Sequence, residues 1–437
     1  MNDQLIDEWL KNQDSKEKSC IKSSYKHFDS KVSKSDYAIN GKYRKDLYFS
    51  NKLNSLKFWP LIRIDQKKRR YSKDLEGKLE IKQKNRSIMY PAHRDSCIMS
   101  FYAFVLRKNY EYKLKNSTLN DSILGYRKIP IAAKSKRNKS NINFANDLFK
   151  SLQTLNGYTV LCIDIKGFFD SINHSVLRKA IEPFSEDLPK NNLQFIIKIV
   201  TKYKYVFYKD VEYVMGKNSW INPKKYNRFI RNTVLEHKNN NAYGIPQGTP
   251  ISDILSNIYL YDFDNSINNK LAKLPKPTIY KRYCDDILVA IPDEYAKEIY
   301  AFILNEIKKY KLEIGANKTE AFYIEANKKI FIDITKKFVK KYTKNKEFLQ
   351  YLGFYMNLNK IIMRSPTVEK HYRKIKKING TRHNVDGAIN KNPLDTYEKI
   401  SSKIINNLSI QKQVLHIRRH SKKILRESAI NKKIKNY

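Results

Sequence analysis

Three aspartates embedded in apolar runs constrain this chain more than any other feature of its sequence. Asp164 lies in VLCIDIKGFFDSI, and the neighbours Asp285 and Asp286 lie in KRYCDDILVAI. Both runs are rich in β-formers, so each aspartate is predicted at the end of a buried strand. Carboxylates in such surroundings are costly unless a cation offsets their charge. The pattern therefore favours a divalent metal site of the kind that carries out phosphoryl or nucleotidyl transfer with two ions.

The charge of the chain indicates the polymer that it handles. Lys and Arg total 86 against 43 Asp and Glu, a formal net charge of +43 over 437 residues. A low-GC genome raises Lys in every protein, but it need not halve the acidic count relative to the basic count, so a polyanionic partner is predicted. No run approaches the ~18 apolar residues of a membrane span, so we expect no membrane partner. The four cysteines form no CxxC pair, which fits a reducing cytoplasm.

Periodicity predicts a mixture of helices and strands. Residues 1–60 are interpreted as a helical extension, and 183–240 as a hairpin plus helix in which TKYKYVFYKDVEYVM alternates like a strand. Asp170 or Ser171 is expected to cap the helix that follows Asp164. The remaining predictions are a strand or hairpin at 79–89, a helix to 114, a strand at 158–165, a helix at 250–260, a hairpin at 278–291 with Asp285–Asp286 at its turn, a helix at 293–311 and basic helices after 359.

Seven pieces, in order, resemble the reverse transcriptase family. IDIKGFFDSI, YGIPQGTPISDILSN, YCDD, GANKTEAFYI and LQYLGF are similar to palm motifs A to E, including the YxDD signature, and KNRSIMYPAHRD and GYRKI look like two fingers motifs. The resemblance implies an α+β right-hand polymerase with fingers, palm and thumb, an antiparallel palm sheet and a helical thumb. The implied parts are an N-terminal helical extension (1–74), fingers (75–157), a palm (158–359) with an inserted segment (183–240), and a helical basic thumb (360–437).

The resemblance also implies roles for the matching residues. Asp164, Asp285 and Asp286 would hold two Mg²⁺ ions, for which Mn²⁺ could substitute, and Lys318 would protonate the departing pyrophosphate. The implied nucleotide-binding residues are Arg86, Arg127, Phe169, Gln247 and Gly248, with Phe169 excluding a ribose 2′-hydroxyl. The implied primer grip is Tyr351, Leu352, Gly353 and Phe354.

Simpler interpretations of these residues stay open. Asp286 could be only a turn residue, and Phe169 and the primer-grip aromatics could be only core. Lys318 could match by coincidence in so basic a chain, and Arg86 and Arg127 could bind the template backbone elsewhere. The motif B glycines could form only a loop-to-helix turn.

The rest of the chain narrows the subfamily. After Phe354 we place neither the maturase and nuclease domains of group II intron enzymes nor an RNase H-like set of carboxylates, and IIMRSPTVEK stands where retron enzymes carry a VTG-type segment. The chain looks most like bacterial defence-associated reverse transcriptases related to abortive-infection enzymes. That resemblance implies cytoplasmic RNA-directed DNA synthesis from dNTPs, in antiviral defence, on a cognate noncoding RNA.

Other functions remain open. The alternatives are a template-independent or protein-primed DNA polymerase, a group II intron or retron-type enzyme, and a nucleoprotein without catalysis. A homo-oligomer or an accessory protein is left open as a further partner.

Overall fold

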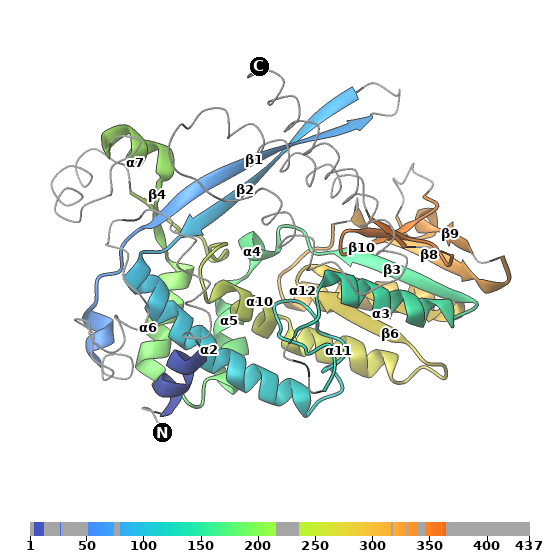
Figure 1. The fold of residues 1–437 in the computed structure, drawn as a ribbon, viewed down its shortest axis with the longest axis horizontal. Helices are drawn as coiled ribbons and strands as arrows, with labels where there is room; N and C mark the ends of the chain where they lie inside the picture. Colours follow the sequence, from blue (N-terminus) through green and yellow to red (C-terminus); the bar gives the residue numbers. More distant parts are fainter. Residues whose placement is uncertain are drawn as a thin grey trace, which may run out of the picture.

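The computed structural model describes residues 4–12, 27, 51–73, 79–133, 135, 137–215, 236–315, 318–328, 330–339, 346–359 and 361–363. Within these ranges it is an α+β fold with separate sheets and surrounding helices, as predicted (Figure 1). None of the helices in the described part of the chain combines the length and the apolar composition that a membrane span requires.

An antiparallel five-stranded sheet forms the palm. The strand predicted at 158–165 and the hairpin predicted at 278–291 are confirmed, and they are neighbours in this sheet. In spatial order the strands are β6 (Ile279–Tyr283), β7 (Asp286–Pro292), β3 (Tyr158–Asp164), β8 (Glu320–Glu325) and β9 (Ile330–Asp333).

The central strands β3 and β7 of the palm sheet are buried on both faces, which explains why β3 is apolar almost throughout. Leu161 and Ile163 point into a large core formed with most of the helices, whereas Val160 points into a smaller core. The helices of the large core are α2 (His93–Lys115), α5 (His174–Ile181), α6 (Lys190–Thr201), α10 (Ser252–Tyr259), α11 (Tyr261–Leu271) and α12 (Ala296–Lys309). The helices predicted up to 114, at 250–260 and at 293–311 are therefore confirmed.

The smaller core lies between the palm sheet, α3 (Asn141–Gln153) and a second sheet. This sheet has three antiparallel strands, β10 (Leu349–Tyr351), β11 (Phe354–Met356) and β12 (Ile361–Met363). The hairpin expected at the primer-grip motif is present. The predicted helical thumb (360–437) begins with a strand instead, because β12 pairs with β11, and residues 364–437 lie outside the described residues.

A third sheet contains a long two-stranded ribbon that extends beyond the helices (Figure 1). Its strands are β2 (Leu79–Tyr90), β1 (Leu61–Lys73), β4 (Lys204–Phe207) and β5 (His237–Lys238). The prediction of a helical extension over 1–74 is wrong for Leu61–Lys73. Those residues pair with β2 along their whole length, and the basic run after Gln66 hides the strand period in the sequence.

The first part of the chain is helical at residues 4–12, where Trp9 is fully buried and its ring lies 5.7 Å from that of Phe101 on α2. Short 3₁₀ helices occur elsewhere: η3 (Asn51–Ser55), η4 (Glu182–Phe184), η6 (Asp293–Tyr295), η8 (Ala326–Lys328) and η9 (Thr335–Lys337).

In the segment 183–240, the alternating run TKYKYVFYKDVEYVM differs from its prediction as a strand. Only Lys204–Phe207 of the alternating run is a strand, because these residues pair with β1 and β5. The chain then turns into α7 (Tyr208–Met215), which buries Val211. Residues 216–235 lie outside the described ranges.

The helix cap after Asp164 is also different from the prediction. Asp170 and Ser171 lie within the short helix α4 (Phe168–Ser171) and do not cap α5. Asn173 caps it, because its side-chain oxygen accepts hydrogen bonds from the backbone of Ser175 (3.1 Å) and Val176 (3.3 Å).

Candidate active site

The three aspartates lie together at one end of the palm sheet. Asp164 and Asp286 are direct cross-strand partners on β3 and β7. The backbone oxygen of Asp285 accepts a hydrogen bond of 3.1 Å from the amide of Ile165, the residue after Asp164. The backbone therefore brings residues from two distant motifs to the same strand ends.

The tight turn that carries Asp285 depends on its neighbour. Cys284 has a φ of 58°, in the left-handed region, so it is Cys284 and not an aspartate that takes the unusual conformation. Burial raises the pKa of the Cys284 thiol to about 12, so it stays protonated at neutral pH and adds no negative charge beside the carboxylates.

A buried ion pair beneath this turn was not foreseen. Arg282 and Asp264 on α11 have fully buried side chains and lie 2.6 Å apart. Arg282 also donates to the oxygens of Asn257 (3.1 Å) and Cys284 (3.2 Å). Burial acts to lower the pKa of Arg282, but Asp264 outweighs it and raises this pKa. The guanidinium therefore stays charged and supports the turn from the buried face of β6, where only Tyr280 and Arg282 are buried.

A second unforeseen support comes from Gly125 in GYRKI. A Cβ at this position would lie 2.5 Å from the backbone nitrogen of Cys284, closer than atoms can pack. The Gly125 oxygen accepts a hydrogen bond of 2.9 Å from the side chain of Asn257. Glycine is required here because the two loops touch backbone to backbone.

Lys318 lies at the same strand ends. Its ammonium forms an ion pair with the Asp164 carboxylate, and the side chains are 53% and 18% exposed. The backbone oxygen of Asp164 also accepts a hydrogen bond of 2.9 Å from Gly315, which starts the turn that carries Lys318. The motif D segment is therefore attached to Asp164 by both backbone and side chain.

The donor set fits a hard divalent cation in kind, although not in its present arrangement. Among the residues that the structure describes, no three acidic, histidine or cysteine side chains converge closely enough to hold a metal. Carboxylate oxygens are the ligands that Mg²⁺ prefers, and the Lys318 ammonium already occupies the place of a cation beside Asp164. An ion at Asp164, Asp285 and Asp286 would compete with Lys318 for the Oδ2 oxygen of Asp164.

The motif A and motif B residues meet next to α4. The amide of Ile245 donates to the oxygen of Phe169 at 2.9 Å. The Phe169 ring is partly buried and lies 5.7 Å from Phe168, so part of it belongs to the core and part of it remains accessible.

The motif B loop is also joined to the ribbon. The oxygen of Gln247 accepts a hydrogen bond of 2.7 Å from the amide of Met89 on β2. Gly248 has a φ of +109°, and a Cβ there would lie 2.8 Å from the oxygen of Met89. Arg86 is exposed on β2, three positions before Met89. The motif B loop is therefore fixed against β2, the strand that also carries Arg86.

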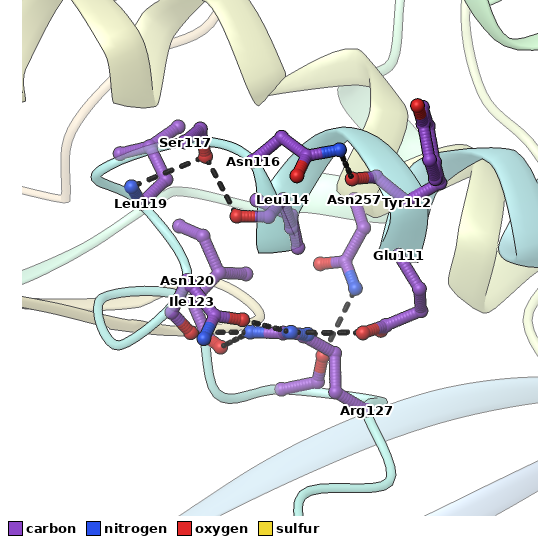
Figure 2. Close-up of polar contacts among 11 residues, drawn as sticks. Glu111, Tyr112, Leu114, Asn116, Ser117, Leu119, Asn120, Ile123, Arg127 and Asn257 are labelled. Carbon is purple, nitrogen blue, oxygen red and sulfur yellow. Dashed lines mark hydrogen bonds and ion pairs between the residues drawn. The ribbon is translucent and has the colours of Figure 1, made fainter.

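Arg127 occupies a different environment from the one expected. Its side chain is 4% exposed and forms a forked ion pair with Glu111 on α2, with distances of 2.9 and 2.8 Å. It also donates to the backbone oxygens of Asn120 (2.6 Å) and Ile123 (2.8 Å), as Figure 2 shows. This geometry does not support the prediction that Arg127 grips a triphosphate, because its donors are used within the protein.

The primer-grip motif forms the turn between β10 and β11. Leu352 and Gly353 have φ angles of 45° and 93°, and Tyr351 and Phe354 are buried in the smaller core. Burial, together with the nearby charge of Asp286, raises the pKa of Tyr351. The hairpin therefore lies close to the aspartates, although its two aromatic rings pack inward.

A cavity of about 440 Å³ lies beside the YCDD turn. Its wall includes Tyr283 of that turn, Tyr126 of GYRKI, and Phe144 and Ser140 of α3 and its cap. Arg127 and Lys139 also line it, so the wall of this cavity combines aromatic, aliphatic and basic side chains.

Comparison with known proteins agrees with the family that the sequence motifs resemble. Residues 103–356 match a family model described as reverse transcriptase (RNA-dependent DNA polymerase). Among solved structures, apo telomerase from Candida tropicalis is 12% identical with a TM-score of 0.42, and the match covers 73% of this chain and 55% of that one. Its form truncated from the C-terminal domain is 13% identical with a TM-score of 0.41, covering 70% and 57%.

A third similar structure is telomerase from Candida albicans in complex with a TWJ fragment of telomeric RNA. It is 12% identical with a TM-score of 0.38, and the match covers 76% of this chain and 52% of that one. The chain thus spans just over half the length of these solved structures. Similarities this low support no functional inference.

Proposed function

The chain belongs to the reverse transcriptase family, and we propose that it is an RNA-directed DNA polymerase that extends a primer with dNTPs. The observation that carries the proposal is the pairing of Asp164 with Asp286 at the strand ends, with Asp285 in the adjoining turn. Carboxylates brought together in this way from motifs A and C suit nucleotidyl transfer, because they can hold the cations that this reaction uses.

We assign the metal site to Asp164, Asp285 and Asp286, with Mg²⁺ as the ion and Mn²⁺ as a substitute. When bound, two such ions neutralise charge on the attacking and leaving oxygens. Lys318 is the proposed proton donor to pyrophosphate. Its ammonium is about half exposed and already lies at Asp164, so it can turn towards a phosphate once the carboxylate takes up metal.

The nucleotide site is proposed beside α4. Phe169 would close the space next to C2′ of the sugar, and Gln247 and Gly248 would lie along the new base pair. Arg86 is exposed and can reach a phosphate from β2. The turn at Leu352 and Gly353 would lie against the primer, with the rings of Tyr351 and Phe354 fixing the hairpin from inside.

We place this activity in a bacterial cytoplasm, in antiviral defence, with a cognate noncoding RNA as template. The support is the motif sequence and the high positive charge, +43 in total, with 19 Lys and Arg against five Asp and Glu in residues 361–437. A basic thumb at 360–437 that grips the duplex is part of the same proposal. Sequencing of nucleic acid that copurifies with the protein, before and after phage exposure, tests it.

A primer-extension assay separates the proposed activity from its alternatives. The purified chain is given dNTPs with a primed RNA template, a primed DNA template, a primer alone, or no nucleic acid. Extension that follows the RNA sequence supports the proposal. Products without a template, or DNA joined covalently to a tyrosine, would assign the site to template-independent or protein-primed synthesis.

A further inference from the structure

A row of aromatic side chains lies on one face of β4. Tyr203, Tyr205 and Phe207 occupy alternate positions and therefore share a face. Their ring centroids lie 6.1 Å apart for Tyr203 and Tyr205, and 5.7 Å apart for Tyr205 and Phe207. All three are only partly buried, so the row is accessible from one side.

Two residues of neighbouring strands complete this row. His237 on β5 is the cross-strand partner of Tyr205, and the two rings are stacked 5.1 Å apart at 19°. Arg63 on β1 lies over Tyr205 (5.3 Å) and Phe207 (5.1 Å) and donates to the Tyr205 hydroxyl at 3.3 Å. We call these five residues, Arg63, Tyr203, Tyr205, Phe207 and His237, the aromatic face.

The aromatic face is not needed to fill a core. The opposite face of the same strands is the buried one, where Val206 pairs with Ile62 and both are almost completely covered. Among the described residues, neither of the two hydrophobic cores includes Tyr203, Tyr205 or Phe207. Aromatic rings in a row on a half-exposed sheet are costly to leave in water without a ligand.

The aromatic face adjoins the candidate active site. Burial raises the pKa of Asp170 on α4, and nearby Arg63 acts the other way; burial and Asp170 in turn raise the pKa of Tyr203. The sheet that carries the face also contains β2, where Met89 binds Gln247. An unpaired template strand that runs along this sheet towards the nucleotide site would therefore pass over the aromatic face first.

The border of the face carries cations, two of which are paired with carboxylates: Arg63 with Asp65 (2.9 Å) and Lys204 with Glu236 (2.6 Å). Lys202 donates to the backbone oxygens of Asn240 (3.2 Å) and Asn241 (2.8 Å), and it has no carboxylate partner among the residues that the structure describes. Lys238 is exposed at the other end of β5. Rings flanked by fixed positive charge suit a ligand with flat bases and a phosphate backbone.

We propose that the aromatic face binds the unpaired template strand ahead of the active site by stacking on its bases. Unstacked bases need open aromatic rings, which a duplex cannot use, and a polyanion matches both the cationic border and the charge of the whole chain. The proposal rests on the proposed function for naming the strand as template, but the binding of single strands can be measured without catalysis.

The test compares full-length variants on primed RNA templates with 5′ overhangs of one or ten nucleotides. For the unaltered protein, the longer overhang raises affinity. In Tyr205→Leu this gain falls about tenfold, whereas affinity for the one-nucleotide overhang and addition of a single dNTP are unchanged. Tyr205→Phe keeps the ring and retains the gain. Tyr213→Leu is the matched control, because Tyr213 is 91% exposed on the adjacent α7.

A second measurement uses the unaltered protein and so does not depend on the folding of Tyr205→Leu. 4-Thiouridine in the overhang of the unaltered complex should crosslink to the peptide containing Tyr203–Phe207. An unchanged overhang gain in a folded Tyr205→Leu, or crosslinks that avoid this peptide, would overturn the proposal. Reduced self-association with unchanged RNA binding would also overturn it and assign the face to protein contact. If polymerisation is absent but the overhang gain depends on Tyr205, only the proposed function fails.

Discussion

The Lys318 ammonium forms an ion pair with the Asp164 carboxylate at the end of β3. It therefore competes with any cation that Asp164 binds. It is also the proposed proton donor to pyrophosphate. Lys318→Gln should lower kcat for dNTP addition by about 100-fold through loss of the acid. It should also lower the Mg²⁺ concentration for half-maximal activity.

Both effects can be read from one set of steady-state rates over a Mg²⁺ titration. Lys166→Gln is the control, because Lys166 pairs with Glu313 on the surface nearby. A variant with lower kcat but an unchanged Mg²⁺ midpoint would argue against the competition.

Phe169 is the second residue open to a direct test. If the exposed part of its ring limits the space beside the sugar, Phe169→Ala should raise the use of ribonucleotides relative to deoxynucleotides by about 10- to 100-fold. Competition between dNTP and rNTP on a primed RNA template measures the ratio. Phe168→Leu changes the buried neighbour and should leave this ratio unaltered. A folded Phe169→Ala with normal selectivity for dNTPs would mean that Phe169 is only a core residue.

Gly125 touches the turn that carries Asp285, so a methyl group there must displace the turn. Gly125→Ala should lower the free energy of unfolding by about 1–3 kcal/mol and sharply reduce polymerisation. Gly157→Ala is the matched control, because Gly157 has a φ of +72° with nothing within 4 Å of its Cβ position. It should cost about 1–2 kcal/mol through backbone strain and leave the rate intact.

Denaturation and extension assays on both variants separate stability from positioning. Equal loss of rate in the two variants would mean that the contact between Gly125 and Cys284 has no specific part in activity.

His174 predicts a dependence of stability on pH. Burial is the main cause that lowers its pKa from 6.5, with Lys202 and Arg178 nearby, although the hydrogen bond of 2.8 Å to Gly244 acts the other way. The unfolded state therefore binds this proton more readily. The contribution is fully present above about pH 6.5 and is lost as pH falls towards the folded pKa, by at most about 1.4 kcal/mol per pH unit.

Chemical denaturation between pH 7.5 and 5 measures this dependence. His174→Gln should flatten the curve, since Gln can donate to the Gly244 oxygen without titrating. An identical decline in both proteins would assign it to other groups.

The parts of the site that could be predicted from the sequence are those encoded by short continuous runs of residues. The apolar strand before Asp164 and the strand after Asp285 were predictable because β3 and β7 are buried on both faces, which leaves a local apolar run. The other strand of the hairpin, β6, alternates in burial, which is also a local pattern. The buried partners of charged residues could not be predicted. Arg127 finds Glu111 and Arg282 finds Asp264 only after separate helices pack, so the same arginine type is equally compatible with a phosphate or a carboxylate.

The errors in secondary structure have the same origin. Leu61–Lys73 is a strand because β2 offers it a partner, and its own sequence is too basic to show the period. The run from Thr201 to Met215 alternates throughout, yet it is a strand only where β1 is within reach. In both cases pairing with a distant segment outweighed the local pattern.

The central claim is that the aspartates at the ends of β3 and β7 form a polymerase site, and primer extension by Asp285→Asn tests it most directly. Asp293→Asn is the control, because Asp293 follows the opposite end of β7 and accepts a hydrogen bond from Thr159. With each protein purified free of host polymerases and shown to bind primed RNA equally well, Asp285→Asn should give no extension above background and Asp293→Asn should extend normally. Extension by Asp285→Asn at the rate of the unaltered protein would contradict the account.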